Sequence, residues 1–253
     1  MITRGCDGKE VEVETTSAAV RTIPRLYDIL FSWYGPQGWW PLLSKAGTPG
    51  YDDEGYHPGV YEVPDAMGAF EIAVGAVLVQ NTAWTNARRA LAVLLERSLC
   101  SPEGILGLEE EALARLIRPC GYYTLKARRL AHLARFFLSC DGLPERNALL
   151  GVWGVGRETA DSILLYGYGV PVFVVDAYTR RIFSRLGLLA SDDTPYEEVR
   201  SAVEKTLPLD HVCYNEFHAL LVEHAKRFCR KRPLCGECPL RLECAHLSSA
   251  GGS

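Results

Sequence analysis

Apolar residues recur every three to four positions through much of the chain, which is the spacing that places them on one face of a helix. The pattern predicts an all-α protein. The expected helices span Ala69–Leu78, Ala83–Leu99, Leu108–Ile117, Leu125–Leu138, Arg157–Tyr166, Ala177–Leu186, Tyr196–Thr206 and Tyr214–Phe228. Ser101-Pro102-Glu103 indicates a further short helix, and Thr194-Pro195 is a helix start signal before Tyr196.

Two stretches depart from the helical period. Val172–Val175 has the composition of a strand, but a lone four-residue strand would have no partner. Ser44–Pro64 is rich in Gly, Pro, Tyr and Asp and is expected to form a long loop. The chain shows no internal repeat.

The composition is that of a globular protein. With 253 residues, 48% of them hydrophobic, the chain can bury one or two cores. It has no apolar run of transmembrane length and no N-terminal signal pattern, so no membrane association is expected. The nine cysteines, an odd number, fit a reducing cytoplasm, with nucleoid association if the source is prokaryotic. Nothing indicates an oligomer, and a monomer is expected.

The net charge is −4, which is unusual for a nucleic-acid-binding protein, but the charges are segregated. Acidic residues gather at Glu109–Glu111 and at Asp192-Asp193 with Glu197-Glu198. Basic residues gather at Arg88-Arg89, Arg128-Arg129, Arg180-Arg181 and between Lys226 and Arg232. Such clusters can bind phosphates in an acidic chain. About half of these arginines are expected to be ordinary solvated helix residues.

A glycine turn between two helical patterns suggests an anion site. Gly154, Val155 and Gly156 allow a tight turn with bare backbone N–H groups. Arg157 and Thr159 then begin a helix, whose positive end suits a phosphate. The alternative is an ordinary structural turn between helices.

A second motif follows the turn. After the loop Gly169-Val170-Pro171, an apolar run leads to a single carboxylate, Asp176. A phosphate-binding turn that precedes a single carboxylate in an apolar segment suggests chemistry on a nucleic-acid strand. Asp176 could also cap the helix that begins at Ala177, and both roles can coexist.

Four cysteines near the C-terminus have the spacing of metal ligands. They are Cys229, Cys235, Cys238 and Cys244. Zinc and a [4Fe–4S] cluster are both chemically possible. The cluster is favoured over zinc, because a structural zinc site usually pairs two Cys-x-x-Cys units and only one is present here. Disulfides or free thiols are the remaining alternative.

These motifs together resemble the endonuclease III superfamily of DNA glycosylases, also called HhH-GPD. Leu149–Asp176 matches its helix-hairpin-helix, Gly/Pro-rich loop and catalytic Asp, and the resemblance covers roughly Val63 to Cys244. The cysteines resemble the iron–sulfur motif of endonuclease III and of the adenine glycosylase of mismatch repair, although the first gap holds five residues rather than six.

The resemblance implies two helical domains with a DNA-binding cleft between them. Residues 65–175 would form a six-helix module, and residues 176–253 a helical domain that carries the cluster motif. Residues 1–64 would supply an N-terminal helix and a long loop that pack with the C-terminal domain.

The resemblance also assigns chemical roles. Asp176 would stabilise an oxocarbenium-like sugar and orient the attacking water. Bifunctional members carry a lysine where this chain has Glu158, and a carboxylate cannot form a Schiff base. We therefore expect a monofunctional glycosylase with weak or absent lyase activity. Glu158 would be a second acid or simply a solvent-facing residue of the first helical turn.

The damaged base must leave the stack to reach Asp176. Gln80 matches the family's inserted glutamine, although a plain helix-end amide is the alternative. The Gln-Asn-Thr-x-aromatic form resembles the relative 3-methyladenine DNA glycosylase III. There, an aromatic residue at the Trp84 position stacks on the flipped base, and an aromatic residue before proline, like Trp40, lines the pocket. Trp39 precedes Trp40, and the alternative is that all three tryptophans belong to the core.

Aromatic faces suit a cationic alkylated purine through stacking and cation–π attraction. The expected partner is therefore double-stranded DNA that contains a damaged base such as 3-methyladenine. The best-known alkylation relative lacks the cluster, which keeps two alternatives open. One is an endonuclease III-like glycosylase and AP lyase for oxidised, deaminated or mismatched bases. The other is a non-catalytic protein that binds damaged DNA.

Overall fold

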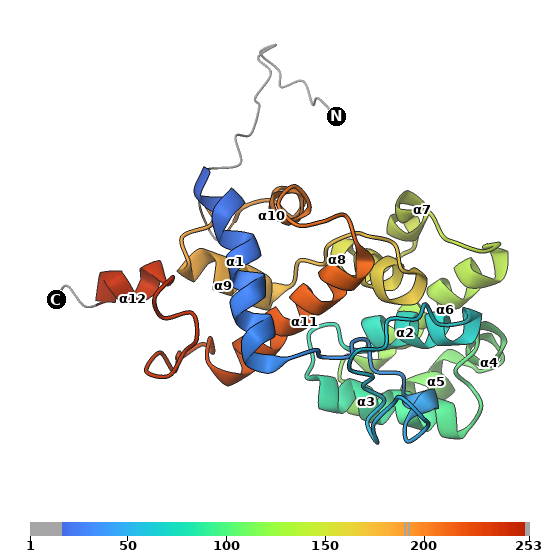
Figure 1. The fold of residues 1–253 in the computed structure, drawn as a ribbon. Coiled ribbons are helices and arrows are strands. Elements are labelled where there is room, and N and C mark those ends of the chain that lie inside the picture. Colours follow the sequence, from blue (N-terminus) through green and yellow to red (C-terminus); the bar gives the residue numbers. More distant parts are fainter. Residues whose placement is uncertain (1–16, 190, 192, 251–253) are drawn as a thin grey trace, which may run out of the picture.

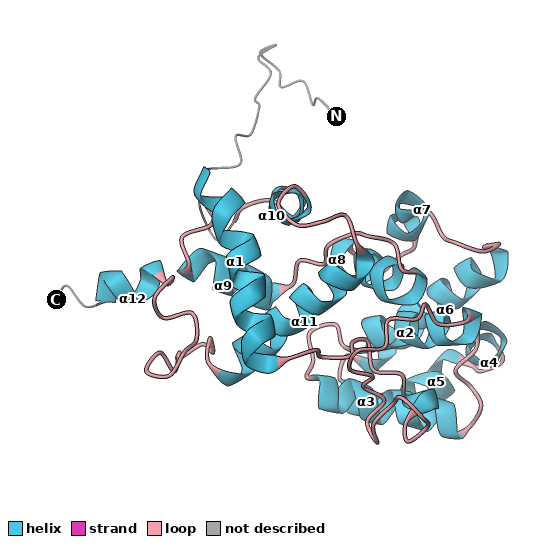
Figure 2. Ribbon diagram, in the orientation of Figure 1, coloured by secondary structure: helices cyan, strands magenta, loops and turns pink. Residues whose placement is uncertain are grey.

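The computed structural model describes residues 17–189, 191 and 193–250, so Asp192 of the expected acidic cluster lies outside the described residues. Within these residues every regular element is helical, which confirms the all-α prediction (Figures 1 and 2). The α-helices are α1 (Ser17–Tyr34), α2 (Ala66–Leu78), α3 (Trp84–Glu96), α4 (Pro102–Leu106), α5 (Glu110–Leu116), α6 (Tyr123–Ser139), α7 (Arg146–Gly151), α8 (Arg157–Ser162), α9 (Ala177–Arg185), α10 (Tyr196–Glu204), α11 (His211–Arg227) and α12 (Ala245–Ala250).

The predicted helices are present, but capping side chains make some of them begin earlier than predicted. Helix α2 begins earlier than its apolar pattern because the Asp65 carboxylate accepts a hydrogen bond from Gly68 N at 2.8 Å. Likewise α11 begins at His211, where Asp210 caps it. The short helix α7 was indicated only as the helical pattern before the glycine turn, and α12 was not predicted, since six residues are too few to show a period.

The predicted helix Arg157–Tyr166 has two parts. Helix α8 continues directly into a π-helical turn, η3 (Ile163–Gly167). A π turn takes up one extra residue, so the side chains after it are rotated by about 100° relative to a straight α-helix. Tyr166 lies within this turn.

Val172–Val175 forms no strand; it is extended coil with buried side chains. Two of its backbone N–H groups bind side chains instead of a neighbouring strand. Phe173 N donates to Glu204 Oε1 at 2.9 Å, and Val175 N donates to the Tyr196 hydroxyl at 3.3 Å. This explains how an apolar run can lead to Asp176 without a sheet.

The helices pack in two groups. Helix α2 contacts α3, α6 and α8, and α6 also contacts α4 and α5. Helix α1 lies against α11, which also packs on α9, so segments from opposite ends of the chain lie side by side (Figure 1). Contacts between α11 and η3 join the groups. No helix in the described residues is long and apolar enough to cross a membrane.

The short 3₁₀ turn η1 (Leu43–Lys45) contacts α3, and the residues that follow it, up to Asp65, are irregular. This confirms the long loop expected at Ser44–Pro64, apart from the 3₁₀ turn at its start. Arg88 of α3 pairs with Glu54 of the loop.

One buried carboxylate fixes the helix that follows the glycine turn. Asp161 of α8 is fully buried, and Arg146 of α7 donates two hydrogen bonds to it at 2.5 and 2.9 Å. The Tyr196 hydroxyl of α10 adds a third at 2.8 Å, and Arg200 lies 3.8 Å away. A buried charge is tolerated only when it is paired in this way. Asp161 therefore ties α8 to α7 and α10.

Replacing Arg146 with Met should lower the free energy of unfolding by about 3 kcal/mol, because it leaves the Asp161 charge buried with poorer compensation. Denaturant unfolding measures the change. The control is Arg128→Met, which removes an exposed pair with Glu110 and should cost less than about 1 kcal/mol. Equal effects of the two substitutions would contradict the role given to Asp161.

Candidate active site

A cavity of about 350 Å³ lies between the two helix groups. Its walls are formed by the segment around Trp39 and Trp40, the turn between α2 and α3, helix α8, the start of α9 and one face of α11. Among the lining residues are Asp176, Glu158, Trp39, Trp40 and Trp84. The structure thus brings together both predicted acids and all three predicted pocket tryptophans, from four separate segments of the chain.

Asp176 is the N-cap of α9. Its Oδ1 accepts a hydrogen bond from Thr179 N at 2.7 Å, while Oδ2 lies 3.6 Å from His218 Nε2. Burial opposes the negative charge, but His218 and the Thr179 amide outweigh it and hold the pKa of Asp176 below its ordinary value. Asp176 is therefore a carboxylate at neutral pH with its side chain only 12% exposed.

Glu158 lies in the first turn of α8 and reaches the same cavity. Desolvation by the surrounding protein, and then the charge of Asp176, raise the pKa of Glu158 to about 7. Glu158 is nevertheless exposed to solvent, as the alternative of a solvent-facing first-turn residue expected, which limits the energy that this shift represents. The environments of the two acids push their pKa values apart, as in sites that need one ionised and one protonated carboxyl.

The aromatic wall has a corner. The rings of Trp40 and Trp84 meet edge to face, with centroids 5.5 Å apart and planes at 85°. Trp39 meets Trp40 at 74°. Trp40 is only 8% exposed and serves both the core and the cavity, while Trp39 and Trp84 are half-buried. An aromatic guest can stack on one ring while another ring faces its edge.

Two buried acids hold the chain around Trp39 and Trp40. Glu71 of α2 accepts a hydrogen bond from Leu43 N at 2.6 Å, and Glu216 of α11 accepts one from Gln37 N at 3.0 Å. Burial raises the pKa of each acid, although these N–H groups favour the charged form. Glu71 could have been noticed as the lone acid within an apolar helix.

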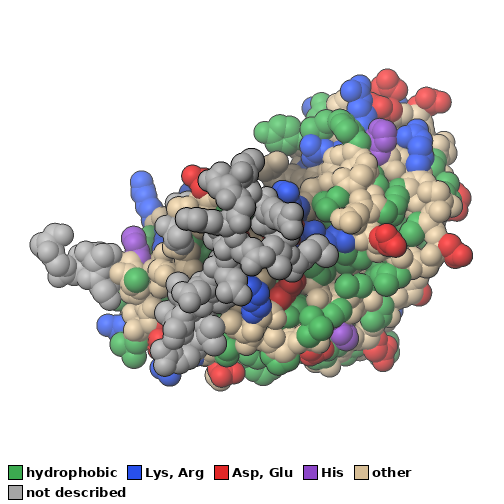
Figure 3. Space-filling view, turned by 90° about the horizontal axis from the view of Figure 1, so that it is seen from above, with side chains coloured by type: hydrophobic (Ala, Val, Ile, Leu, Met, Phe, Trp, Pro, Cys, Tyr) green, Lys and Arg blue, Asp and Glu red, His purple; other side chains and the backbone are tan. Residues whose placement is uncertain are grey.

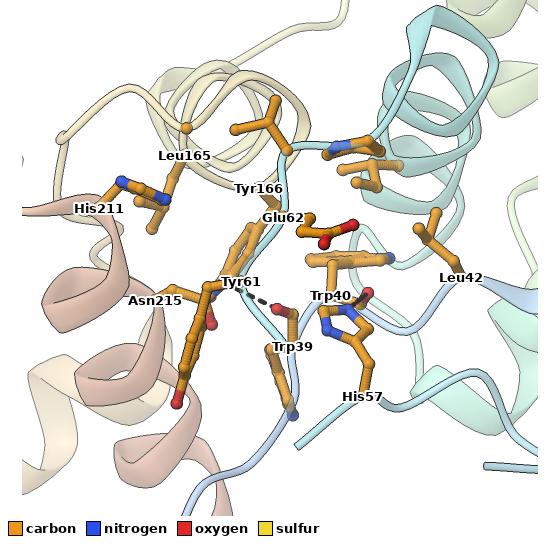
Figure 4. Close-up of a pocket in the computed structure, with 14 residues that line it drawn as sticks. Trp39, Trp40, Leu42, His57, Tyr61, Glu62, Leu165, Tyr166, His211 and Asn215 are labelled. Carbon is orange, nitrogen blue, oxygen red and sulfur yellow. Dashed lines mark hydrogen bonds between the residues drawn. The ribbon is translucent and has the colours of Figure 1, made fainter. Parts of the chain in front are cut away.

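Backbone carbonyls in the same segment are also held. Asn215 Nδ2 donates to Trp39 O at 2.7 Å, and His57 Nε2 lies 2.9 Å from Trp40 O. Figure 4 shows this side of the indoles, where Trp39, Trp40 and Tyr166 are among the residues that line a second cavity of only about 20 Å³. The tryptophans therefore line the larger cavity on a rigid support.

The glycine turn joins α7 and α8, as predicted. Gly154 has φ +90°, which L-residues rarely adopt, and a Cβ there would lie 2.3 Å from Arg129 Cγ. Gly156 is the N-cap of α8, and Val155 is buried. Of the predicted hairpin side chains, Arg157 is exposed, 3.3 Å from Glu197, whereas Thr159 is buried.

Gln80 lies beside the turn and does not line the cavity. Its Nε2 donates to Gly154 O at 3.1 Å and to Thr159 Oγ1 at 2.9 Å, and its Oε1 accepts from Arg129. The structure therefore places Gln80 between α2 and the turn, and its insertion into DNA stays a prediction.

Sequence reasoning did not identify His218, Tyr166 or Lys226 as site residues. His218 and Lys226 line the cavity from α11. The Tyr166 hydroxyl is hydrogen-bonded to His218 Nδ1, the ring nitrogen that faces away from Asp176. A single histidine or tyrosine on a buried helix face has no distinguishing spacing. Lys226 was noted as part of a basic cluster, and its Nζ lies 5.4 Å from the centre of the Trp39 ring. Burial lowers the pKa of Lys226.

The four C-terminal cysteines, Cys229, Cys235, Cys238 and Cys244, line one small cavity of about 30 Å³ with the ends of α9 and α11. None of the four forms a disulfide within the described residues. Arg185 Nη1 lies 3.2 Å from Cys229 Sγ, and His224 Nε2 lies 3.6 Å from Cys238 Sγ. Among the described residues, no three His, Cys, Asp or Glu side chains are grouped to hold a metal ion.

Several of the clustered arginines have structural partners. Arg128 pairs with Glu110, Arg180 donates to Thr194 O, and Arg181 donates to Cys229 O. On the face shown in Figure 3, basic and acidic side chains are interspersed among apolar ones.

Comparison with known proteins gives consistent matches. The family model for HhH-GPD superfamily base excision DNA repair proteins matches residues 74–209. A predicted DNA repair glycosylase of Methanocaldococcus jannaschii is 41% identical over 234 residues, which cover 88% of this chain and 95% of that relative.

Two solved structures have similar folds. Endonuclease III in a trapped covalent intermediate with DNA superposes with a TM-score of 0.71 at 21% identity, covering 92% of this chain and 98% of that one. The H. pylori 3-methyladenine DNA glycosylase bound to 1,N6-ethenoadenine gives 0.62 at 26% identity, covering 81% of this chain and 97% of that one.

The raised pKa of Glu158 has a consequence for stability. Between its ordinary value of 4.5 and about 7, the folded protein binds a proton that the unfolded chain has released, so Glu158 lowers stability as the pH rises. The free energy of unfolding of Glu158→Gln should therefore rise relative to that of wild type across this pH window, by about 1 kcal/mol after allowance for solvent screening. Urea unfolding at pH 4.5 and pH 8 measures the difference. An equal difference between the two proteins at both pH values would contradict the raised pKa of Glu158.

Proposed function

Because the chain belongs to the HhH-GPD superfamily of base excision DNA repair proteins, we propose that it is a monofunctional DNA glycosylase for alkylated purines such as 3-methyladenine. The observation that carries this proposal is an ionised carboxylate, Asp176, in the wall of a cavity that three indoles also line. The cavity suits a base taken out of the DNA stack.

Asp176 has the chemistry that base removal needs. Breaking the N-glycosidic bond creates positive charge on the sugar, and a carboxylate that is ionised before the reaction stabilises that charge without reorganisation. The same carboxylate can orient or deprotonate water. Glu158, which titrates near neutral pH, can donate a hydrogen bond to the base or accept one from it.

Two observations support the substrate class. The corner formed by Trp40 and Trp84 offers π-faces and edges to an electron-poor purine. The H. pylori relative, whose fold is similar, is a 3-methyladenine glycosylase bound to a modified adenine. The residue at the hairpin position is Glu158 and not lysine, which supports hydrolysis over Schiff-base chemistry.

The partner we propose is double-stranded DNA. The exposed Arg157 and the N-terminus of α8, which continues into η3, suit a phosphate of the strand. Gln80, held beside this turn, would insert into the duplex only after it exchanges its hydrogen bonds with Gly154 and Thr159.

We further propose that Cys229, Cys235, Cys238 and Cys244 hold a [4Fe–4S] cluster. Four thiols that line one cavity match the number of ligands that such a cluster needs, and none of them forms a disulfide. The cluster would fix the shape of the basic loop from Lys226 to Arg232.

A second candidate function rests on Lys226. It lines the cavity with Asp176, and its lowered pKa makes a free amine more available. An amine in this position favours an endonuclease III-like glycosylase and AP lyase.

Asp176→Asn should lower base release by at least about 100-fold, because an amide cannot stabilise the sugar cation. The fold should persist, since asparagine caps helices as well as aspartate does. The assay uses duplexes that each carry one lesion: 3-methyladenine, 7-methylguanine, hypoxanthine, uracil, thymine glycol or 8-oxoguanine. Asp65→Asn makes the same change at the cap of α2, away from the cavity, and should keep full activity.

The form of the products separates the alternatives. Release of a methylated purine, with strand breaks only after alkali, supports the proposal. Release of another base instead would replace the substrate class. Nicking without alkali, with a borohydride-trapped adduct that Lys226→Ala abolishes, would establish the second candidate. Lesion binding without any release would mean a damage-binding protein.

Protein purified without oxygen should be brown and contain about four iron and four sulfide per chain. Cys238→Ser should lose most of this iron, while Cys213→Ser, outside the set, should retain it. A colourless wild-type protein that contains zinc would refute the cluster.

A further inference from the structure

His218 of α11 connects two groups that lie far from it in sequence. Its Nδ1 is hydrogen-bonded to the Tyr166 hydroxyl, and its Nε2 lies 3.6 Å from Asp176 Oδ2. The ring is only 4% exposed, and Nε2 makes no hydrogen bond within the described residues. A buried ring nitrogen facing a carboxylate at this distance is close to its partner but not in full contact.

The neighbours of the ring decide where its proton lies. The Tyr166 hydroxyl can donate to Nδ1, which leaves the proton on Nε2, where it faces the Asp176 carboxylate. The opposite tautomer would place a lone pair against that negative charge, which is unfavourable in a buried site. The arrangement therefore favours a Tyr166–His218–Asp176 series in which Tyr166 donates to Nδ1 and the Nε2 proton faces the Asp176 carboxylate.

Packing holds the ring in this position. The indole of Trp39 and the ring of Phe173 both meet the imidazole edge to face, with centroids 5.8 and 6.3 Å away. Tyr166, whose hydroxyl is bonded to the ring, lies in the π turn η3. Three separate segments thus fix the histidine that faces Asp176.

We propose that His218 is a positioning residue that orients Asp176 and keeps it ionised for base release, with Tyr166 setting the histidine tautomer. The inference rests on the proposed glycosylase function. Other charged groups also act on this site: Glu158 from α8, Arg180 from α9, and Glu216 and Lys226 from α11. None of these has an ion-pair contact with Asp176 within 4 Å in the described residues, whereas His218 does.

Single-turnover base release over a range of pH tests the proposal. His218→Ala should lower the maximal rate about 10- to 100-fold, as expected when a catalytic group is misplaced. Affinity for the lesion duplex should stay within about twofold. Loss of the histidine removes a partner that favours the charged form of Asp176, so activity should fall off at a higher pH on the acid side.

Conservative variants separate this role from a merely structural one. His218→Gln supplies a neutral N–H donor and should recover part of the rate and of the pH profile. Tyr166→Phe should show a smaller loss in the same direction, and adding it to His218→Ala should cause no further loss. His211→Ala, on the same helix but outside the larger cavity, is the control and should behave as wild type.

A measurement without DNA makes the inference independent of activity. Nitrogen-15 spectra of histidine-labelled full-length protein, with His218 assigned by its loss in His218→Ala, should show a proton on Nε2. Tyr166→Phe should weaken that preference. A proton on Nδ1 alone, or a His218→Ala enzyme with the wild-type rate and pH profile, would overturn the proposal.

The two proposals fail in different ways. If wild-type protein releases no base from any duplex, the glycosylase assignment fails, and the spectra alone then decide whether the Tyr166–His218–Asp176 series exists. If wild-type protein is active and His218→Ala is unchanged, the role of His218 fails and the glycosylase assignment stands.

Discussion

The paired charge of Asp161 is the interaction on which the geometry of the cavity depends. Its carboxylate lies inside α8, and Arg146 and Tyr196 bind it from the neighbouring helices. The Tyr196 hydroxyl also accepts from Val175 N, one residue before Asp176. A single buried network therefore sets both α8, which carries Glu158, and the end of the extended segment that delivers Asp176. The positions of the two cavity acids therefore depend on Asp161 and Arg146, which do not line the cavity.

The two acids of the cavity are treated differently by their surroundings. Asp176 receives an amide N–H and faces His218, so the charge on it is supported. Glu158 receives no comparable support and feels the charge of Asp176, so it retains a proton near neutral pH. The difference arises from placement, because the two carboxyl groups are chemically alike.

Local features were predictable from the sequence, and features made by distant residues were not. The glycine turn, the tryptophans and Asp176 each have a signature within a few neighbouring residues. The Tyr166–His218 bond joins positions 52 residues apart, and Glu71 binds backbone 28 residues earlier. Helical periodicity marks such residues only as buried. The π turn also escapes periodicity, since its extra residue changes the phase only locally.

The placement of the indoles also gives the molecule an optical property. Of its five tryptophans, three line the cavity, while Trp33 and Trp153 are 56% and 49% exposed. Indole fluorescence depends on the polarity of the surroundings and on stacking partners. The cavity indoles and the two surface indoles therefore emit from different environments, and external quenchers reach the surface pair more readily. The protein thus carries its own fluorescent reporter of what enters the cavity, with no added label.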